Sequence, residues 1–555
     1  MPAGCIFGDK GPAAFVVNDS VDDLLALAAI TNSQAFGLLV SLQLARTELA
    51  QSYEVGLIQK TPVPVITAAD QIILATLARR AWSLKRAIDT RTEISHAFTL
   101  PALLQFEVAT LAERSAAWSL WVATTEAQFT AIQTEIDARC FELYCISDAD
   151  RRAITEGFGS AGETASDPAD PDADSDAESD SEEAEEAAAD AATLTAELIS
   201  WAVGVAFGRF DVRLATGARA LPPEPEPFDA LPVCSPAMLT GDDGLPLSVA
   251  PAGYPLQKLP EGGVLVDDPN HPRDLPAAVR AVFEVVFGDA ADARWNEAAA
   301  LLDPREQNLR NWLAKGFFEQ HLKRHSKSRR KAPILWQLAT ASSSYSVWLY
   351  AHRIRKDTFF LVQSELVAEK LAHEERAQAT LEKEAGPSPS PAQRKAMAAQ
   401  DTLLEELRTL LDEVKRIAPL WLPNLDDGVV LTMAPLFRLV PHYKPWQKEL
   451  KAAWDGLAAG KFDWAHLAMH LWPERVVPKC ATDRSLAIAH GLEDVFWVEA
   501  PLGKWKARPA PTRSVDELTR ERTSAAVKAS LKSLVEAPIV GGGGAKRGRK
   551  PRAND

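Results

Sequence analysis

The side chains best suited to chemistry are cationic, and they gather in one short segment. Six Lys and Arg residues stand between positions 321 and 331, namely Lys323, Arg324, Lys327, Arg329, Arg330 and Lys331. The sequence then turns apolar and aromatic, with Trp336 and Tyr345 soon after. Positive charge beside aromatic rings suits a surface that holds a phosphate backbone and stacks against bases. The other interpretation is a solvated helix face that leads into a core strand.

A second candidate surface is the proline-bounded stretch Pro441-His-Tyr-Lys-Pro-Trp446. Recognition residues often lie on loops of this kind. We therefore predict DNA contacts from His442, Lys444 and Trp446, and also from Tyr345. The six cations are expected to contact phosphates, and one of the arginines could read a guanine in the major groove. For Tyr345, as for Trp336, a place in the core is the alternative.

Two histidine pairs have helical spacing, His321 with His325 and His466 with His470. A zinc site needs a third ligand, and neither pair has the His-Glu-x-x-His pattern, so we expect histidines that are hydrogen-bonded or face phosphate. The sequence has no Walker-type phosphate loop, no Gly-x-Ser-x-Gly elbow and no Cys–His nucleophile pattern. No catalytic residue and no metal ligand is predicted for this chain.

Composition indicates an ordinary globular protein of several domains, because 555 residues exceed what one core usually supports. The net charge of −16 is concentrated, since thirteen Asp and Glu and no Lys or Arg lie between Glu163 and Asp190. Charge near a binding surface matters more to a polyanion than the total, because salt screens contacts beyond about 10 Å. Five scattered cysteines, and no signal pattern or long apolar run, predict a cytoplasmic protein that does not enter a membrane.

The pattern of periodicity, proline and charge predicts a helix-rich α+β protein with long antiparallel helical arms. Long helices are expected at 68–98 and 101–140, and two charged helices at 361–384 and 393–417, joined by Gly386-Pro-Ser-Pro-Ser-Pro391. The predicted segments are 1–157, a truncated specificity-type region of a hairpin and long helices; 158–192, a disordered acidic linker; 193–360, a helical region with the DNA-facing segment; 361–418, the helical arm; 419–500, a Trp- and Pro-rich region; and 501–555, a flexible basic tail.

Several blocks of the sequence together resemble one family of enzymes. They include Val203-Gly-Val-Ala-Phe-Gly-Arg-Phe210 and Ala434-Pro-Leu-Phe-Arg-Leu-Val-Pro-His-Tyr-Lys-Pro-Trp446. The others lie at 2–15, 52–59, 328–336 and 464–479. In this order they are similar to the C-terminal half of large type IIG adenine-specific DNA methyltransferases, and most of all to the phage-defence methyltransferases of BREX and DISARM systems.

The resemblance implies a DNA-recognition half without its catalytic half. In such enzymes the N-terminal half supplies a Rossmann-like domain that binds S-adenosylmethionine, and an Asn-Pro-Pro-aromatic motif that holds the flipped adenine. Here the pair Pro222-Pro223 follows Leu221 and precedes Glu224, so it does not fit that motif. We therefore expect target-recognition domains without a Rossmann domain, no cofactor in this chain, and no methyl transfer by the chain alone.

Three function classes follow from this interpretation. The first is the DNA-binding portion of a site-specific adenine methyltransferase from a restriction-modification or phage-defence system, with double-stranded DNA and a separate methyltransferase chain as partners. The second is a structural subunit that docks other defence-system proteins through the arm at 361–417. The third is a self-sufficient enzyme, which the missing motifs disfavour. The start at Met1 is expected to reflect a split or truncated gene.

Overall fold

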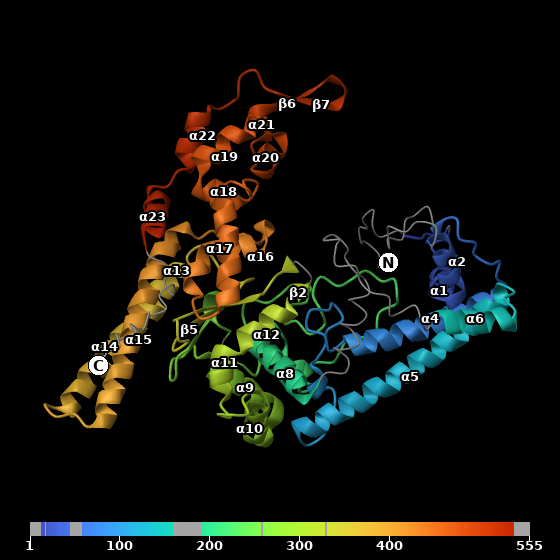
Figure 1. Cartoon of the computed structure of the whole chain (residues 1–555), viewed down its shortest axis with the longest axis horizontal. Helices are drawn as coiled ribbons and strands as arrows, with labels where there is room; N and C mark the ends of the chain where they lie inside the picture. The colour runs from blue at the N-terminus through green and yellow to red at the C-terminus, as the bar shows by residue number, and fades with distance from the viewer. Residues whose placement is uncertain are drawn as a thin grey trace, which may run out of the picture. The chain divides into compact units, whose positions relative to one another are not determined.

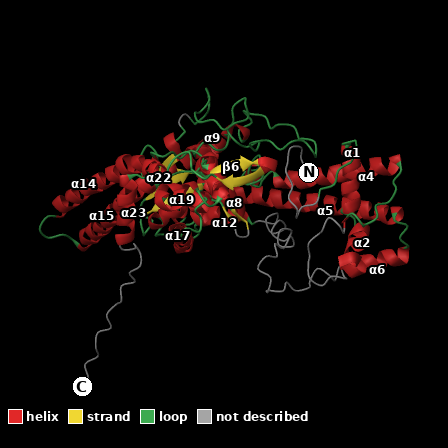
Figure 2. Cartoon of the chain, turned by 90° about the horizontal axis from the view of Figure 1, so that it is seen from above, coloured by secondary structure: helices red, strands yellow, loops and turns green. Residues whose placement is uncertain are grey.

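A computed structural model of the chain describes residues 13–16, 18–44, 58–158, 190–256, 259–327 and 330–537. These residues are mostly helical with small antiparallel sheets, as expected for the helix-rich α+β class (Figure 1 and Figure 2). They divide into two compact units. Unit 1 comprises Met1–Gln257 and Val282–Gln307, and unit 2 comprises Lys258–Ala281 and Asn308–Asp555. The predicted segment 193–360 therefore contributes to both units.

Several predicted features lie outside the described residues. They are most of the hairpin expected near the N-terminus, the first part of a strand that the run 51–65 predicts, the acidic segment from 159 to 189, and residues 538–555 of the tail. The first part of the segment expected as a flexible tail, 501–537, instead contains the strand Lys504–Ala507 and the helices Val515–Arg522 and Ala525–Glu536. Residues 59–65, the described part of the strand expected at 51–65, contain no strand. Pro62 and Pro64 lie there, and a proline cannot donate a backbone hydrogen bond to a sheet.

Unit 1 is built from helices. Its described helices and 3₁₀ turns are α1 (Val21–Thr31), α2 (Gln34–Leu44), α4 (Ala68–Asp89), η1 (Ala102–Leu104), α5 (Leu111–Leu143), α6 (Asp148–Phe158), α8 (Ala191–Ala206), η3 (Val212–Leu214), η5 (Gly288–Ala290) and α10 (Ala291–Leu302). The boundary between the units falls within α9 (Leu275–Phe287).

The two long helices of unit 1 end and begin at places other than those predicted. Helix α4 stops at Asp89 instead of continuing to residue 98, and α5 begins at Leu111 instead of residue 101. The cause at the second site is a capping box, in which Thr110 and Glu113 satisfy each other's backbone N–H groups. A helix begins where its free N–H groups find acceptors, and Pro101 opens only a short 3₁₀ turn.

Unit 1 has two regions of core. Apolar residues of α1, α2, α4, α5 and α6 form one cluster, in which Ile30, Leu74 and Ile136 are buried. Helix α8 is buried along most of its length and packs against η1, α5 and α10. Gly204 of α8 is required by this packing, because a Cβ atom there would approach the Phe210 ring to 2.5 Å.

Unit 2 holds the predicted DNA-facing segments. Its first elements are η4 (Glu261–Gly263), β1 (Val264–Asp267), α11 (Leu309–Lys315), α12 (Phe317–Arg324), β2 (Ser326–Lys327), β3 (Arg330–Lys331), β4 (Leu335–Ala339), β5 (Ser346–Tyr350), α13 (Thr358–Leu361), the π-helix η6 (Val362–Val367), α14 (Ala368–Ala385) and α15 (Pro391–Ile417). The remainder are η7 (Ala418–Leu420), η8 (Leu425–Asp427), α16 (Val429–Met433), η9 (Ala434–Leu439), α17 (Lys444–Ala458), α18 (His466–Leu471), α19 (Pro473–Cys480), α20 (Arg484–Ala489), α21 (Glu493–Phe496), β6 (Trp497–Ala500), η10 (Pro501–Gly503), β7 (Lys504–Ala507), α22 (Val515–Arg522) and α23 (Ala525–Glu536).

A three-stranded antiparallel sheet of order β1-β5-β4 lies at the centre of unit 2. Every residue of β4 and β5 is buried, so both faces of the sheet are covered. On one face Trp348 contacts Phe317 and Phe318 of α12, with ring centroids 5.4 and 6.2 Å apart. On the other face Trp336 packs against Trp421 at 5.9 Å.

Helices α14 and α15 form the antiparallel arm expected from the sequence (Figure 1). Helix α15 begins at Pro391 with a capping box formed by Ser390 and Gln393. A π-helical segment, rather than the expected α-helix, precedes α14. The base of the arm is joined to the residue after β1 by Lys370, which pairs with Asp268 at 2.6 Å and, within α14, with Glu374 at 2.7 Å.

Within the described part of the chain, no single helix is long and apolar enough to cross a membrane. Helices α1 and α2 pass such a test only as a pair bent by 63°, and their apolar residues belong to the buried cluster of unit 1.

Candidate nucleic-acid interface

The predicted basic segment forms the end of α12 and the small hairpin β2–β3. The hairpin pairs Ser326 with Lys331 and Lys327 with Arg330. Lys323 in the last turn of α12 is exposed, and Arg324 beside it is partly buried. Arg329, together with the side chains of Lys327 and Arg330, lies outside the described residues. The cations thus belong to a helix end and a hairpin, and the core strands β4 and β5 follow them.

His321 fixes this basic segment to the central sheet. It is buried, and its Nε2 atom accepts hydrogen bonds from the backbone N–H groups of Ile334 at 3.2 Å and Leu335 at 3.0 Å. The ring of His325 stacks on it at a centroid distance of 4.2 Å. His321 is therefore hydrogen-bonded, one of the two roles expected for it, and it positions the start of β4 relative to α12.

The two predicted surfaces meet, although more than a hundred residues separate them in the sequence. Phe318 of α12 contacts the rings of His442 and Tyr443, with centroids 6.4 and 6.1 Å apart. Lys331 of the β2–β3 hairpin forms an ion pair with Glu449 of α17. The basic segment and the first turns of α17 consequently adjoin in unit 2, and we term their combined exposed surface the basic face. It comprises Lys323, the β2–β3 hairpin, Lys444 and Lys448.

Helix α17 divides its side chains between this face and the core. Lys444 and Lys448 are exposed, whereas Trp446, Leu450 and Trp454 are buried. Trp446 has 1% of its surface exposed, so its ring cannot contact DNA as predicted. Its spacing with Leu450 and Trp454 is that of the buried stripe of an amphipathic helix.

Tyr345 is buried as well, with 1% of its surface exposed at the start of β5. Burial raises the pKa of its hydroxyl, which stays protonated. The predicted DNA contact by Tyr345 is therefore not available, and the alternative of a core aromatic holds. The physical reason is that Tyr345 directly precedes β5, the central strand of a sheet covered on both faces, and its backbone carbonyl accepts a hydrogen bond from Thr340 N at 3.0 Å.

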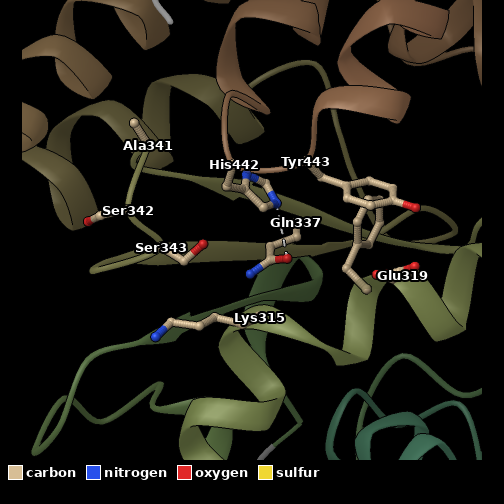
Figure 3. A pocket seen from close by; sticks show the side chains of 9 residues that line it. Lys315, Glu319, Gln337, Ala341, Ser342, Ser343, His442 and Tyr443 are labelled. Atoms are coloured by element: carbon tan, nitrogen blue, oxygen red, sulfur yellow. Dashed lines mark hydrogen bonds between the residues drawn. The ribbon is translucent and has the colours of Figure 1, made fainter. Parts of the chain in front are cut away.

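His442 lies at the inner edge of the basic face with its ring held by Gln337 (Figure 3). The Gln337 amide donates to the Ala314 carbonyl at 2.7 Å and to Ser346 Oγ at 3.0 Å, so its oxygen accepts from His442 Nε2 at 3.1 Å. Burial, and secondly the charge of Lys444, lower the pKa of His442 to about 4. At neutral pH this histidine is uncharged and supports the fold instead of attracting phosphate.

A cavity of about 240 Å³ opens beside His442 (Figure 3). Its lining residues are Lys315, Phe318, Glu319, Gln337, Ala341, Ser342, Ser343, His442 and Tyr443. The turn between β4 and β5 forms one wall, and Ser343 there has a left-handed backbone with φ of 58°. Glu406 of α15 holds the turn by accepting from Ser342 N at 3.1 Å, Ser342 Oγ at 2.6 Å and Ser344 Oγ at 2.9 Å.

Several residues that build this region are not among the predicted ones. Lys448 is the one that a local pattern indicates, because it stands one helical turn after Lys444. Gln337, Glu406 and Glu449 act through partners 62 to 118 residues away, and no local pattern indicates such contacts.

The second histidine pair, His466 and His470, makes hydrogen bonds within the fold. Asp427 is buried and accepts hydrogen bonds from the backbone N–H groups of His466 and Leu467, each at 2.8 Å, and from His466 Nδ1 at 2.9 Å. His470 approaches the Pro419 carbonyl at 3.4 Å. Among the described residues no group of three or more His, Cys, Asp or Glu side chains is placed to hold a metal ion.

Asp427 caps α18 from a distant part of the chain, so its removal should destabilise unit 2. We expect Asp427→Ala to lower the free energy of unfolding by about 1–2 kcal/mol, because two N–H groups lose their acceptor. Asp427→Asn keeps one side-chain oxygen and should lose less. Urea unfolding measures both, and an alanine variant as stable as the parent would contradict this role.

Comparisons with known proteins give no further lead, since no family model matches the sequence and no curated protein matches it significantly.

Proposed function

We propose that this chain is the DNA-binding portion of a site-specific adenine methyltransferase of the restriction-modification or phage-defence kind. In this proposal unit 2 holds double-stranded DNA on the basic face, and methyl transfer belongs to a catalytic half on another chain. The observation that supports it best is the meeting of two cationic segments, which the ion pair of Lys331 with Glu449 brings together. The methyltransferase identity rests on the sequence resemblance, and the S-adenosylmethionine of the reaction is assigned to the other chain.

The charge on the basic face suits phosphate contacts. Lys323, Lys444 and Lys448 are exposed, and none of them has an ion-pair partner among the described residues. Among the residues that the structure describes, Lys444 Nζ contacts the amide oxygen of Gln447 at 3.1 Å and no carboxylate. Lysines in this state can release counterions from a DNA backbone, which is the main source of sequence-independent affinity.

The test replaces Lys323 and Lys444 by glutamine in the full chain and follows duplex binding against salt. The slope of log affinity against log salt should fall by about 0.9 for each lost phosphate contact. The matched control is Lys383→Gln with Lys395→Gln, two exposed lysines on the arm that carry the same total charge. The proposal is contradicted if the chain does not bind duplex DNA, or if the Lys323 and Lys444 variants leave the salt slope unchanged.

The catalytic part of the proposal has its own measurement. The pure chain should transfer no methyl group from labelled S-adenosylmethionine to DNA, and activity should arise only with a partner chain that carries the Asn-Pro-Pro-aromatic half. Turnover by the pure chain would show that the chemistry lies in residues of this chain instead.

The arm favours a second candidate, a subunit that docks other proteins. In α14 only Glu374 is buried, and polar pairs such as Arg408 with Glu375, at 2.9 Å, connect the two helices. A helix that is polar all round can span solvent between domains, which leaves its faces open to other proteins. Copurification of a partner through the arm, with no duplex binding by the chain, would favour this function over the first.

A further inference from the structure

A second hairpin, distant in sequence from the basic face, has the features of a DNA-contacting β-ribbon. Strands β6 and β7 are joined by the turn η10, and the register pairs Ala500 with Lys504 and Val498 with Lys506. Side chains alternate along a strand, so Lys504 and Lys506 share one face, whereas Trp505 lies on the other. The hairpin extends from α21 beyond the helices next to it (Figure 1).

The tryptophan face of this hairpin is fixed to the neighbouring helices. The guanidinium of Arg484 in α20 lies 4.2 Å from the Trp505 ring centroid and pairs with Glu493 at 2.7 Å. Trp497 Nε1 donates to the Cys480 carbonyl at 2.9 Å, and Arg508 Nε donates to the Trp497 carbonyl at 3.0 Å. A two-stranded hairpin is marginal by itself, and these contacts hold it in one position.

The lysine face is open. Lys504 and Lys506 are exposed, and neither has an ion-pair partner among the residues that the structure describes. Their cross-strand neighbours Ala500 and Val498 carry no charge, and the acidic residue of β6, Glu499, faces the other way with Trp505. Two uncompensated charges thus project from one side of an anchored ribbon.

The helices before the hairpin add a second feature. Helices α19 and α20 are joined by Ala481, Thr482 and Asp483, and Asp483 caps α20 by accepting from Leu486 N at 3.2 Å. A turn of three or four residues between packed helices also occurs in helix-turn-helix proteins. Ser485 and Ile488 of the second helix are exposed, the latter by 51%.

We propose that the β6–β7 hairpin is a second DNA contact, with Lys504 and Lys506 on the phosphate backbone of a duplex. The partner follows from charge complementarity, and β-ribbons enter DNA grooves in several protein classes. This inference rests on the proposed function, because it extends the same DNA binding to other residues. The competing explanation is that the lysines only prevent edge-to-edge pairing of an exposed hairpin.

The experiment uses the full chain with Lys504→Gln and Lys506→Gln, compared with the Lys383→Gln and Lys395→Gln control. Duplex affinity is measured by fluorescence anisotropy over a series of salt concentrations. The salt slope should fall by about 0.9 for each lysine, and therefore by about 1.8 in the double variant. The control should keep the parent slope. The melting temperature should not change, because both lysines are exposed and unpaired among the described residues.

The outcomes separate this inference from the proposed function. If the variants of the basic face lower the slope and the hairpin variant does not, the hairpin inference fails and the proposed function stands. A hairpin variant that aggregates while its slope equals the parent's would assign the lysines to edge protection. If the parent chain does not bind duplex DNA, the proposed function and the hairpin inference are both wrong.

Discussion

Replacing Trp348 by alanine should lower the free energy of unfolding of unit 2 by about 3–5 kcal/mol, the usual cost of deleting a buried aromatic side chain. Trp348 is completely buried in β5, the central strand of the sheet. Its ring contacts Phe317 and Phe318, so the deletion opens a cavity between the sheet and α12. Because Phe318 also contacts His442 and Tyr443, the loss should loosen the basic face and lower duplex affinity.

The measurement combines urea unfolding with hydrogen exchange, since two units need not unfold together. Exchange should rise first in β4, β5 and α12. Trp464→Ala is the matched control, because 46% of that side chain is exposed, and it should cost far less. Trp348→Phe should fall between the parent and the alanine variant. If Trp348→Ala and Trp464→Ala proved equally stable, the central sheet would not be the core of unit 2.

Local patterns in the sequence predicted helices better than they predicted burial. The arm is an example, because a long charged periodic pattern and a Gly-Pro-Ser-Pro break are both local. Thr110 and Glu113 stand at capping-box spacing and mark the start of α5, whereas Pro101, which predicts a start ten residues earlier, does not begin the helix. Helix starts follow from short-range hydrogen bonding, which a single sequence contains.

Burial depends on contacts that a local pattern does not contain. Tyr345 directly precedes β5, whose place in the sheet follows from its pairing with β1, a strand about 80 residues away. An aromatic residue that follows a basic run has the same local sequence whether its side chain faces solvent or the core. Trp446 differs, because its spacing with Leu450 and Trp454 already indicated a buried helix face.

In the candidate site, too, local patterns predict some features, and contacts between distant segments decide the others. The sequence shows which segments are cationic, and the lysines at 323 and 444 are exposed as a DNA surface requires. It does not show that these segments adjoin, since Lys331 and Glu449 pair across 118 residues. It also gave His442 a role in DNA contact, whereas Gln337 and burial keep that ring neutral.

The neutral state of His442 predicts that unit 2 loses stability in mild acid. The pKa of His442 is about 4 in the folded protein, against about 6.5 for a histidine in an unfolded chain. Between these values the unfolded chain binds a proton that the folded protein does not, so stability falls as the pH falls. The contribution of His442 is complete above pH 6.5 and is lost by about pH 4, and at pH 5 the loss is about 2 kcal/mol.

His442→Gln isolates this contribution, because a glutamine amide can still donate to Gln337 but does not titrate. Burial lowers the pKa of His470 and His490 as well, but those groups titrate in both proteins and cancel in the comparison. The parent should therefore lose more stability than the variant between pH 7.5 and pH 5. His373→Gln, an exposed site on the arm, controls for the loss of a histidine.

Urea unfolding at a series of pH values gives the result directly. Equal losses in the parent and in His442→Gln would mean that the pKa of His442 is the same in the folded and unfolded protein, so that the ring gains its proton in mild acid and becomes available to phosphate there. A smaller loss in the variant instead confirms that the ring between the sheet and α17 stays neutral. Under the proposed function the cations of this face that contact DNA are then the lysines and arginines alone, and the salt slope should not change with His442→Gln at pH 7.5.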